Sequence, residues 1–153
     1  MDRNQQQKKI SPNGSTFPVP VLLGEFKDNF TTNTTNKPSK EEIINHALKF
    51  HSQGNLSEAS KYYEYFINQG YEDPNVFTNY GLILKNKGNL KAAEFLQRKA
   101  IKLKPDFAIA HANLGIILVD IGKLEEAELS TREAIKINPK NPMLHYNLGN
   151  ILS

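Results

Sequence analysis

The sequence predicts an all-α fold, an α-solenoid of about three and a half helix-turn-helix repeats preceded by a disordered N-terminal tail. The main observation is a fixed period. Gly54, Gly88 and Gly122 stand 34 residues apart, and three further ladders of residues keep the same phase. These ladders are Leu56, Leu90 and Leu124; Ala59, Ala93 and Ala127; and Asn45, Asn79, Asn113 and Asn147. A period of this length is typical of stacked repeats that each contain two helices.

Residues 1–39 are rich in Gln, Asn, Lys, Ser, Thr and Pro and show neither a helical nor an alternating apolar period. Such a segment cannot bury enough apolar surface to offset the entropy lost on ordering, so we expect a disordered tail. The exception is the apolar patch 17–26, where Pro18 and Pro20 favour an extended backbone. Two interpretations of the patch stay open: it is solvated, or it docks on the array or on a partner.

From Lys40 onward, apolar residues are spaced by three and four, and glycine interrupts them at regular intervals. The period divides this region into the repeats 40–73, 74–107 and 108–141, followed by a partial repeat 142–153. In the third repeat we expect one helix over 108–121 and a second over 125–137, which ends before Pro139.

The partial repeat holds a first helix without a second one. We therefore expect four apolar side chains to face water there and to allow self-association. They are Leu144, Leu148, Ile151 and Leu152.

Charge and composition exclude several classes of partner. The net charge of +3 comes from 19 basic and 16 acidic residues, a balance that indicates neither a nucleic-acid nor a membrane partner. The apolar run 19–23 is far shorter than the roughly 20 residues of a membrane span. The chain has no cysteine and so needs no oxidising compartment. We expect a cytoplasmic protein.

No residues have the spacing of a nucleophile with its base, a phosphate-binding loop or a metal cluster. We therefore expect no enzyme activity, no cofactor and no metal site. His111 and His145 share one repeat position, which favours a packing role over metal binding. Lys91, Arg98 and Lys102 share a face of the second helix in repeat two, where RNA phosphate or an acidic protein could bind, although a solvated outer face is the commoner meaning.

The residues Asn113-Leu-Gly115, Ala127, Ala134 and Pro139, with Asn147-Leu-Gly149 repeating the start, resemble the tetratricopeptide-repeat (TPR) signature. The resemblance covers 40–153. Repeat one departs from the pattern at four positions, so its packing is expected to be looser or specialised. These positions are His46, Ala47, Phe66 and Tyr71.

In this family, antiparallel helix pairs stack into a right-handed superhelix, and the first helices line a concave groove that binds a peptide or a partner helix. The resemblance therefore implies a protein-protein interaction scaffold or adaptor with a peptide ligand. By family position, the groove residues are Asn45, Leu48, Ser52, Thr78, Asn79, Leu82, Asn86, Ala112, Asn113, Ile116, Asp120, Tyr146, Asn147 and Asn150.

The Asn ladder resembles that of the O-linked N-acetylglucosamine transferase repeat region, where one carboxamide per repeat suits an extended backbone because it both donates and accepts. The alternative is that Asn is a common consensus choice at this position. The family's carboxylate clamp for chaperone tails needs basic residues at positions that here hold Ile44, Leu48, Asn79, Ile109 and Asn113. With no cation there, we predict against chaperone-tail binding.

Similar bacterial arrays often precede a transferase domain. The alternative function is therefore a substrate-recruiting N-terminal region of a larger transferase whose catalytic domain is absent from this sequence.

Overall fold

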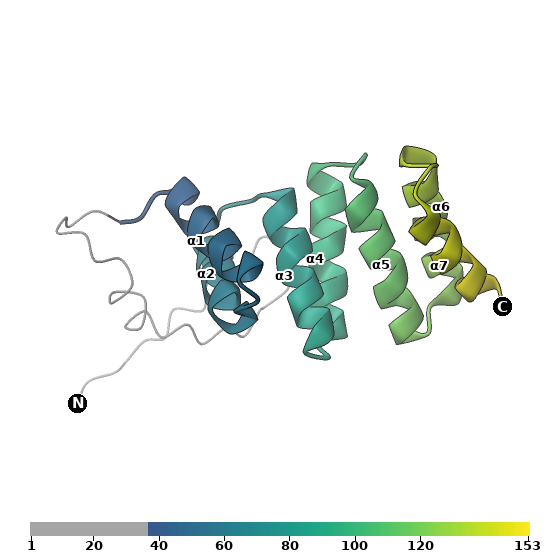
Figure 1. The fold of residues 1–153 in the computed structure, drawn as a ribbon, viewed down its shortest axis with the longest axis horizontal. Coiled ribbons are helices and arrows are strands. Elements are labelled where there is room, and N and C mark those ends of the chain that lie inside the picture. Colours follow the sequence, from purple (N-terminus) through teal and green to yellow (C-terminus); the bar gives the residue numbers. More distant parts are fainter. Residues whose placement is uncertain (1–36) are drawn as a thin grey trace, which may run out of the picture. The chain divides into compact units, whose positions relative to one another are not determined.

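A computed structural model describes residues 37–153, which belong to the second of two units, 1–34 and 35–153, into which the chain divides. Nearly all of the predicted tail, including the apolar patch 17–26, lies outside the described residues. The regular structure of residues 37–153 is entirely helical, which confirms the all-α prediction (Figure 1). The helices are α1 (Lys40–Ser52), α2 (Leu56–Asn68), α3 (Pro74–Asn86), α4 (Leu90–Leu103), α5 (Ala108–Ile121), α6 (Leu124–Ile137) and α7 (Pro142–Leu152).

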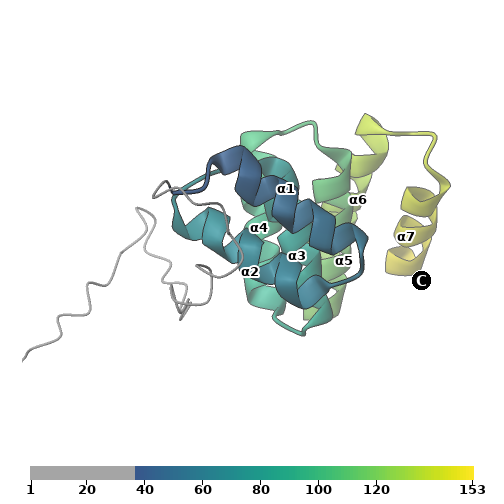
Figure 2. The same cartoon turned by 60° about the vertical axis from the view of Figure 1, so that its left-hand side comes forward.

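The helices pack as consecutive pairs: α1 with α2, α3 with α4, and α5 with α6. Each second helix also packs against the first helix of the next pair, so α7 lies against α6. In addition, α3 contacts α5 and α5 contacts α7, which places these first helices beside one another. Figures 1 and 2 show the pairs following each other in chain order, and the α-solenoid prediction is confirmed.

Glycine forms the turn inside each complete pair. Gly54, Gly88 and Gly122 have φ angles of 73°, 79° and 86°, a left-handed conformation that residues with a Cβ rarely adopt. The chain therefore reverses direction within three residues, and the second helix begins close to the end of the first. This is the physical reason for the glycine ladder in the sequence.

Polar side-chain caps mark the start of three of the first helices, α1, α3 and α7. The Ser39 side chain accepts from the Glu42 backbone N–H, and the Glu42 carboxylate accepts from the Ser39 N–H, which forms a capping box at α1. Asp73 caps α3, and Asn141 caps α7, each directly before a proline at the first helical position.

Small residues let the two helices of a pair approach closely. Ala59, Ala93 and Ala127 are completely buried in α2, α4 and α6. The first repeat was expected to have looser or specialised packing, and large rings fill the space between its two helices. Phe66 is fully buried, and its ring centroid lies 5.4 Å from that of Tyr71. The first repeat is specialised by aromatic packing.

Of the four apolar side chains expected to face water on the last helix, three are at least half-buried. Leu144 is only 3% exposed, because α7 packs against both α5 and α6. Ile151 packs on the buried cluster formed by Leu114, Leu118 and Ala127. Leu148 is half-buried, and Leu152 is left as the exposed member of the four. None of the described helices is long and apolar enough to cross a membrane.

Candidate functional site

The candidate site is the surface formed by the predicted residues of α1, α3, α5 and α7, which we call the groove face. The 34-residue period places Asn45, Asn79, Asn113 and Asn147 at the same turn of these four helices. Because α3 contacts α5 and α5 contacts α7, the last three asparagines come from neighbouring helices.

The asparagines have different surroundings. Asn45 is exposed, whereas Asn79 and Asn147 are half-buried. The Asn79 Nδ2 group donates to the Tyr63 hydroxyl at 3.4 Å, and the same hydroxyl lies 3.0 Å from His51 Nδ1. Asn79 is therefore partly engaged inside the protein, which the sequence ladder alone did not indicate.

Asn113 is the most deeply placed member of the ladder. Its exposure is 8%, and its Nδ2 atom is buried with no hydrogen-bond partner among the described residues. A buried donor without an acceptor costs about 1–3 kcal/mol. A carbonyl oxygen supplied by a ligand would remove this cost.

A pocket of about 160 Å³ lies between α5 and α7 on the groove face. It brings together four of the predicted groove residues with two apolar neighbours. Its lining consists of Ile116, Val119, Asp120, Asn147, Asn150 and Ile151. Asn113 precedes Ile116 by three residues and Asp120 by seven, so it lies on the same side of α5. The pocket therefore combines amide groups, one carboxylate and an apolar surface.

An ion pair borders this pocket. Lys85 Nζ on α3 lies 3.3 Å from an Asp120 carboxylate oxygen on α5, and both side chains are partly exposed. The pair links two neighbouring first helices on the groove face. An exposed pair of this kind contributes little to stability, at most about 1 kcal/mol, so both groups are available to a polar ligand.

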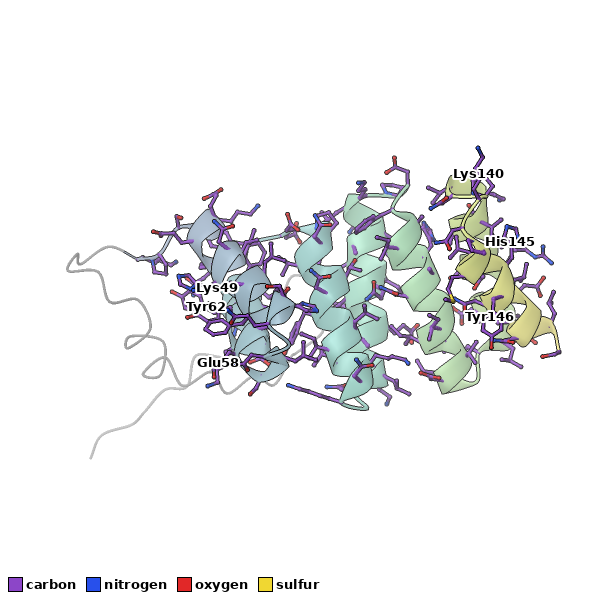
Figure 3. The ribbon with its side chains drawn as sticks, viewed as in Figure 1. Lys49, Glu58, Tyr62, Lys140, His145 and Tyr146 are labelled. Atoms are coloured by element: carbon purple, nitrogen blue, oxygen red, sulfur yellow. The ribbon has the colours of Figure 1, made fainter. Side chains whose placement is uncertain are left out.

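The remaining predicted groove residues divide by exposure. Leu48, Ser52, Asn86 and Tyr146 are exposed, and Figure 3 labels Tyr146 on α7. Leu82 and Ala112 are half-buried. Thr78 is only 2% exposed, and its backbone carbonyl accepts a hydrogen bond from Gln97 Nε2 at 3.1 Å. Thr78 is therefore covered by the protein itself and is not accessible to a ligand on the groove face.

Sequence reasoning missed Tyr63 and His51. Tyr63 stands one period before Gln97 and two periods before Thr131, and all three side chains are buried. The sequence did carry a signal for Tyr63, because an aromatic residue stands there at a repeat position that holds Gln97 and Thr131 in the next two repeats. Burial raises the pKa of Tyr63, and this effect outweighs the lowering by its hydrogen bond with Asn79. The hydroxyl therefore keeps its proton and can donate.

The histidines that share a repeat position make the same contact. His111 Nε2 lies 2.8 Å from the Pro105 carbonyl oxygen, and His145 Nε2 lies 2.8 Å from the Pro139 carbonyl oxygen. Each ring thus ties the first turns of a first helix to the loop that leads into it from the helix before. Within residues 37–153, no three His, Asp or Glu side chains are grouped closely enough to hold a metal ion.

Comparison with known proteins identifies the repeats. Residues 74–107 match the sequence model of the tetratricopeptide repeat, and residues 115–153 match a second model described as a TPR repeat. Residues 74–107 and 115–153 are therefore tetratricopeptide repeats. No curated protein matches this TPR chain.

Solved structures with the same fold include three that illustrate its range. The first TPR domain of Spaghetti, bound to an HSP90 peptide, aligns with a TM-score of 0.68 at 21% identity, over 73% of this chain and 89% of that chain. An O-GlcNAc transferase of Thermobaculum terrenum aligns with a TM-score of 0.67 at 25% identity, over 74% of this chain and 22% of that chain. YrrB, a TPR protein with an unusual peptide-binding site, aligns with a TM-score of 0.68 at 20% identity, over 74% of this chain and 58% of that chain.

Proposed function

We propose that this TPR protein is an interaction scaffold that holds an extended peptide on its groove face. The observation that carries the proposal is the buried, unpartnered amide donor of Asn113 beside the α5–α7 pocket. Folding alone leaves this donor without an acceptor. The Nδ2 atom is covered in the free chain, so neighbouring side chains must move before a peptide carbonyl reaches it, but no hydrogen bond of Nδ2 inside the protein is lost when they do.

An extended peptide suits the rest of the pocket. Its backbone offers N–H and C=O groups alternately, and the carboxamides of Asn147 and Asn150 can pair with either. Ile116 and Ile151 form an apolar surface for one peptide side chain. Asp120 can accept from a peptide N–H or a basic side chain. The contacts to the backbone make the proposed grip tolerant of sequence.

A chaperone tail is a poor candidate ligand. The family's clamp needs cations to bind the terminal carboxylate, and three of its positions here hold Ile44, Leu48 and Ile109. Leu48 and Ile109 are exposed and apolar, so they would leave a carboxylate without a partner. The HSP90 peptide seen with Spaghetti therefore does not define the ligand proposed for this chain.

The proposal can be tested by peptide display. Random peptides selected on the folded chain would be labelled, and their dissociation constants measured by fluorescence anisotropy on wild type and on the double variant Asn113→Ala, Asn147→Ala. Loss of two hydrogen bonds should weaken binding by about tenfold or more. The matched control is Asn68→Ala, an exposed asparagine at the end of α2. Wild-type affinity in the double variant would overturn the groove-face proposal.

A second candidate function is recruitment of protein substrates for a transferase. Its support is the alignment with the bacterial O-GlcNAc transferase, in which this chain spans about a fifth of the enzyme. Recruitment predicts that selected peptides are enriched in Ser and Thr, the hydroxyl-bearing acceptors of a glycosyl group. An adaptor with no such link predicts no enrichment.

A further inference from the structure

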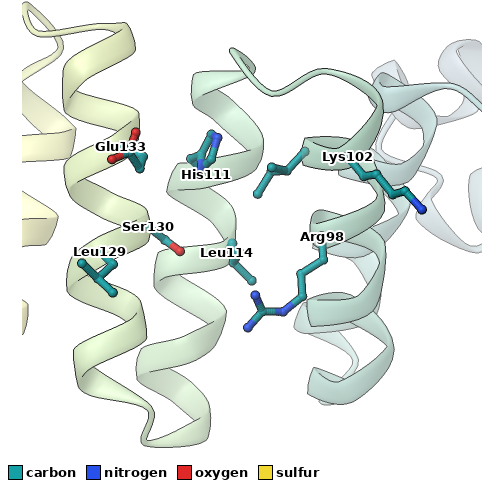
Figure 4. A pocket seen from close by; sticks show the side chains of 8 residues that line it. Arg98, Lys102, His111, Leu114, Leu129, Ser130 and Glu133 are labelled. Atoms are coloured by element: carbon teal, nitrogen blue, oxygen red, sulfur yellow. The ribbon is translucent and has the colours of Figure 1, made fainter.

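A larger pocket, of about 360 Å³, lies on the other side of α5, between α4 and α6 (Figure 4). We call it the α4–α6 pocket. His111 and Leu114 contribute to it from α5. At 100° per residue, these two side chains lie on the opposite side of the helix from Ile116 and Asp120, which face the groove. The pocket is therefore separate from the groove face.

Part of the α4–α6 pocket is apolar. Leu114 is buried at its base, Ile101 of α4 is half-buried, and Leu129 of α6 is 66% exposed. A leucine this exposed beside a cavity has apolar surface that a ligand side chain can cover. Burying such a side chain is favourable by about 25 cal/mol for each Å² removed from water.

The charges of the pocket are unequal. Arg98 and Lys102 line it from α4, and Glu133 lines it from α6. Glu133 is already hydrogen-bonded to Lys136, which lowers the pKa of its carboxyl group and keeps it ionised. Lys102 is exposed and has no ion-pair partner among residues 37–153. The uncompensated charge at the pocket is therefore positive.

Arg98 extends from α4 toward α5 and α6, whereas the exposed Lys102 side chain points away from these two helices, as Figure 4 shows. Its Nη2 atom lies 2.8 Å from a Glu94 carboxylate oxygen and 2.6 Å from one of Glu126. These bonds hold the guanidinium at the pocket's edge. Lys102, one turn further along α4, is left as the flexible cation.

We propose that the α4–α6 pocket binds a second peptide segment, one in which an acidic residue stands next to a large apolar residue. The apolar side chain would cover Leu129 and Ile101, and the carboxylate would pair with Lys102. Charge complementarity selects the acidic residue, and the leucine surface distinguishes the peptide from a plain phosphate ligand. The array then has a peptide site on each side of α5.

The test uses the full chain with the groove disabled by Asn113→Ala and Asn147→Ala, so that the α4–α6 pocket is examined independently of the proposed groove. Peptides from a random display library would be selected on this protein and sequenced. The enriched peptides would be labelled, and their dissociation constants measured on this protein and on further variants of it. Lys102→Glu and Leu129→Ser each change an exposed side chain, and circular dichroism would check that both variants stay folded.

Enriched peptides should pair Asp or Glu with a neighbouring Leu, Phe or Trp. Lys102→Glu and Leu129→Ser should each weaken their binding by about tenfold or more, and added salt should weaken it further. The matched control Lys91→Glu reverses a charge on the same face of α4 but about three turns away and outside the pocket lining, so it should leave the affinity nearly unchanged.

Three results would overturn the proposal: no enriched peptide, peptides insensitive to either substitution, or equal losses in Lys91→Glu. Binding of a labelled single-stranded oligouridine would test whether the pocket takes a nucleic acid instead. If it bound with a dependence on Lys102 but not on Leu129, the pocket would be an electrostatic surface and not a peptide site.

Discussion

A Cβ atom built on Gly115 would lie 2.5 Å from Oγ1 of Thr131 and 3.3 Å from the Ala127 carbonyl oxygen. Gly115 is in α5, and the other two residues are in α6, so the glycine sets how closely this pair packs. We predict that Gly115→Ala lowers the free energy of unfolding by about 1–3 kcal/mol, because overpacking outweighs the better helix propensity of alanine. Urea unfolding followed by circular dichroism would measure the change.

Gly149 is the matched control, because it occupies the same repeat position in α7 and a Cβ there meets nothing within 4 Å. Gly149→Ala should stabilise the protein by up to about 1 kcal/mol through helix propensity alone. Equal effects at Gly115 and Gly149 would contradict the packing explanation.

Asn113→Ala should separate stability from binding. The substitution removes a buried donor that has no partner, so the free energy of unfolding should stay constant or rise by up to about 2 kcal/mol. The affinity for a groove-selected peptide should fall in the same variant. Thermal unfolding would measure the stability and fluorescence anisotropy the peptide affinity, both on one protein sample. A variant that loses stability without losing affinity would show that Asn113 serves the fold.

Glu94 joins α4 to the start of α6. Its carboxylate accepts from Arg98 Nη2 at 2.8 Å and from Lys123 Nζ at 3.2 Å. Burial alone would raise the pKa of Glu94, but the hydrogen bonds and charges of Arg98 and Lys123 outweigh it and lower the pKa. Because the folded-state pKa is depressed, the stability from this group is present above about pH 4.3 and is lost as the pH falls.

Glu94→Gln should therefore destabilise the protein by about 1 kcal/mol at neutral pH and have less effect in acid. Asp106→Asn is the control, since Asp106 is an exposed carboxylate in the loop between α4 and α5, has no ion pair within residues 37–153 and should show little change. Urea midpoints measured across the acid range would reveal the difference. If the urea midpoints of wild type and Glu94→Gln changed with pH in the same way, ionised Glu94 would not be the source of this stability.

The hydroxyl of Tyr80 on α3 donates to the carboxylate of Glu64 on α2. Burial raises the pKa of Tyr80, and its hydrogen bond with Glu64 and the charge of Glu64 raise it further. The folded protein therefore keeps this proton when the unfolded chain has lost it, so the contribution is complete below about pH 10 and declines as the pH rises above that value.

Tyr80→Phe should lower the free energy of unfolding by about 1–2 kcal/mol at neutral pH, because it leaves the Glu64 carboxylate without its donor. Tyr146→Phe, at an exposed position on α7, should have almost no effect. Ultraviolet absorbance during alkaline titration would follow the tyrosines directly. An early-titrating phenol that disappears in Tyr80→Phe would contradict the raised pKa.

The sequence predicted the helices well where glycine and proline mark their ends. The helix expected over 108–121 coincides with α5, and the one expected over 125–137 differs from α6 by one residue at its start. A left-handed turn at Gly122 needs glycine for a local steric reason, so the sequence carries this information directly.

The site was harder to predict because burial depends on packing between helices. Thr78 and Asn79 are adjacent in sequence, yet Thr78 is buried against α4 while Asn79 reaches the Tyr63 hydroxyl on α2. The exposed leucine of the α4–α6 pocket follows from the spacing of two helices that are not consecutive in the chain. A periodic pattern places residues on a helix face but does not fix such distances.

The most direct test of the groove-face proposal is nuclear magnetic resonance of the ¹⁵N-labelled chain, titrated with a groove-selected peptide. We predict that the side-chain NH₂ signals of Asn113 and Asn147 shift with the peptide concentration, while that of Asn68 stays in place. Shifts confined to residues around Lys102 and Leu129, with the Asn113 and Asn147 amides unchanged, would contradict the proposal.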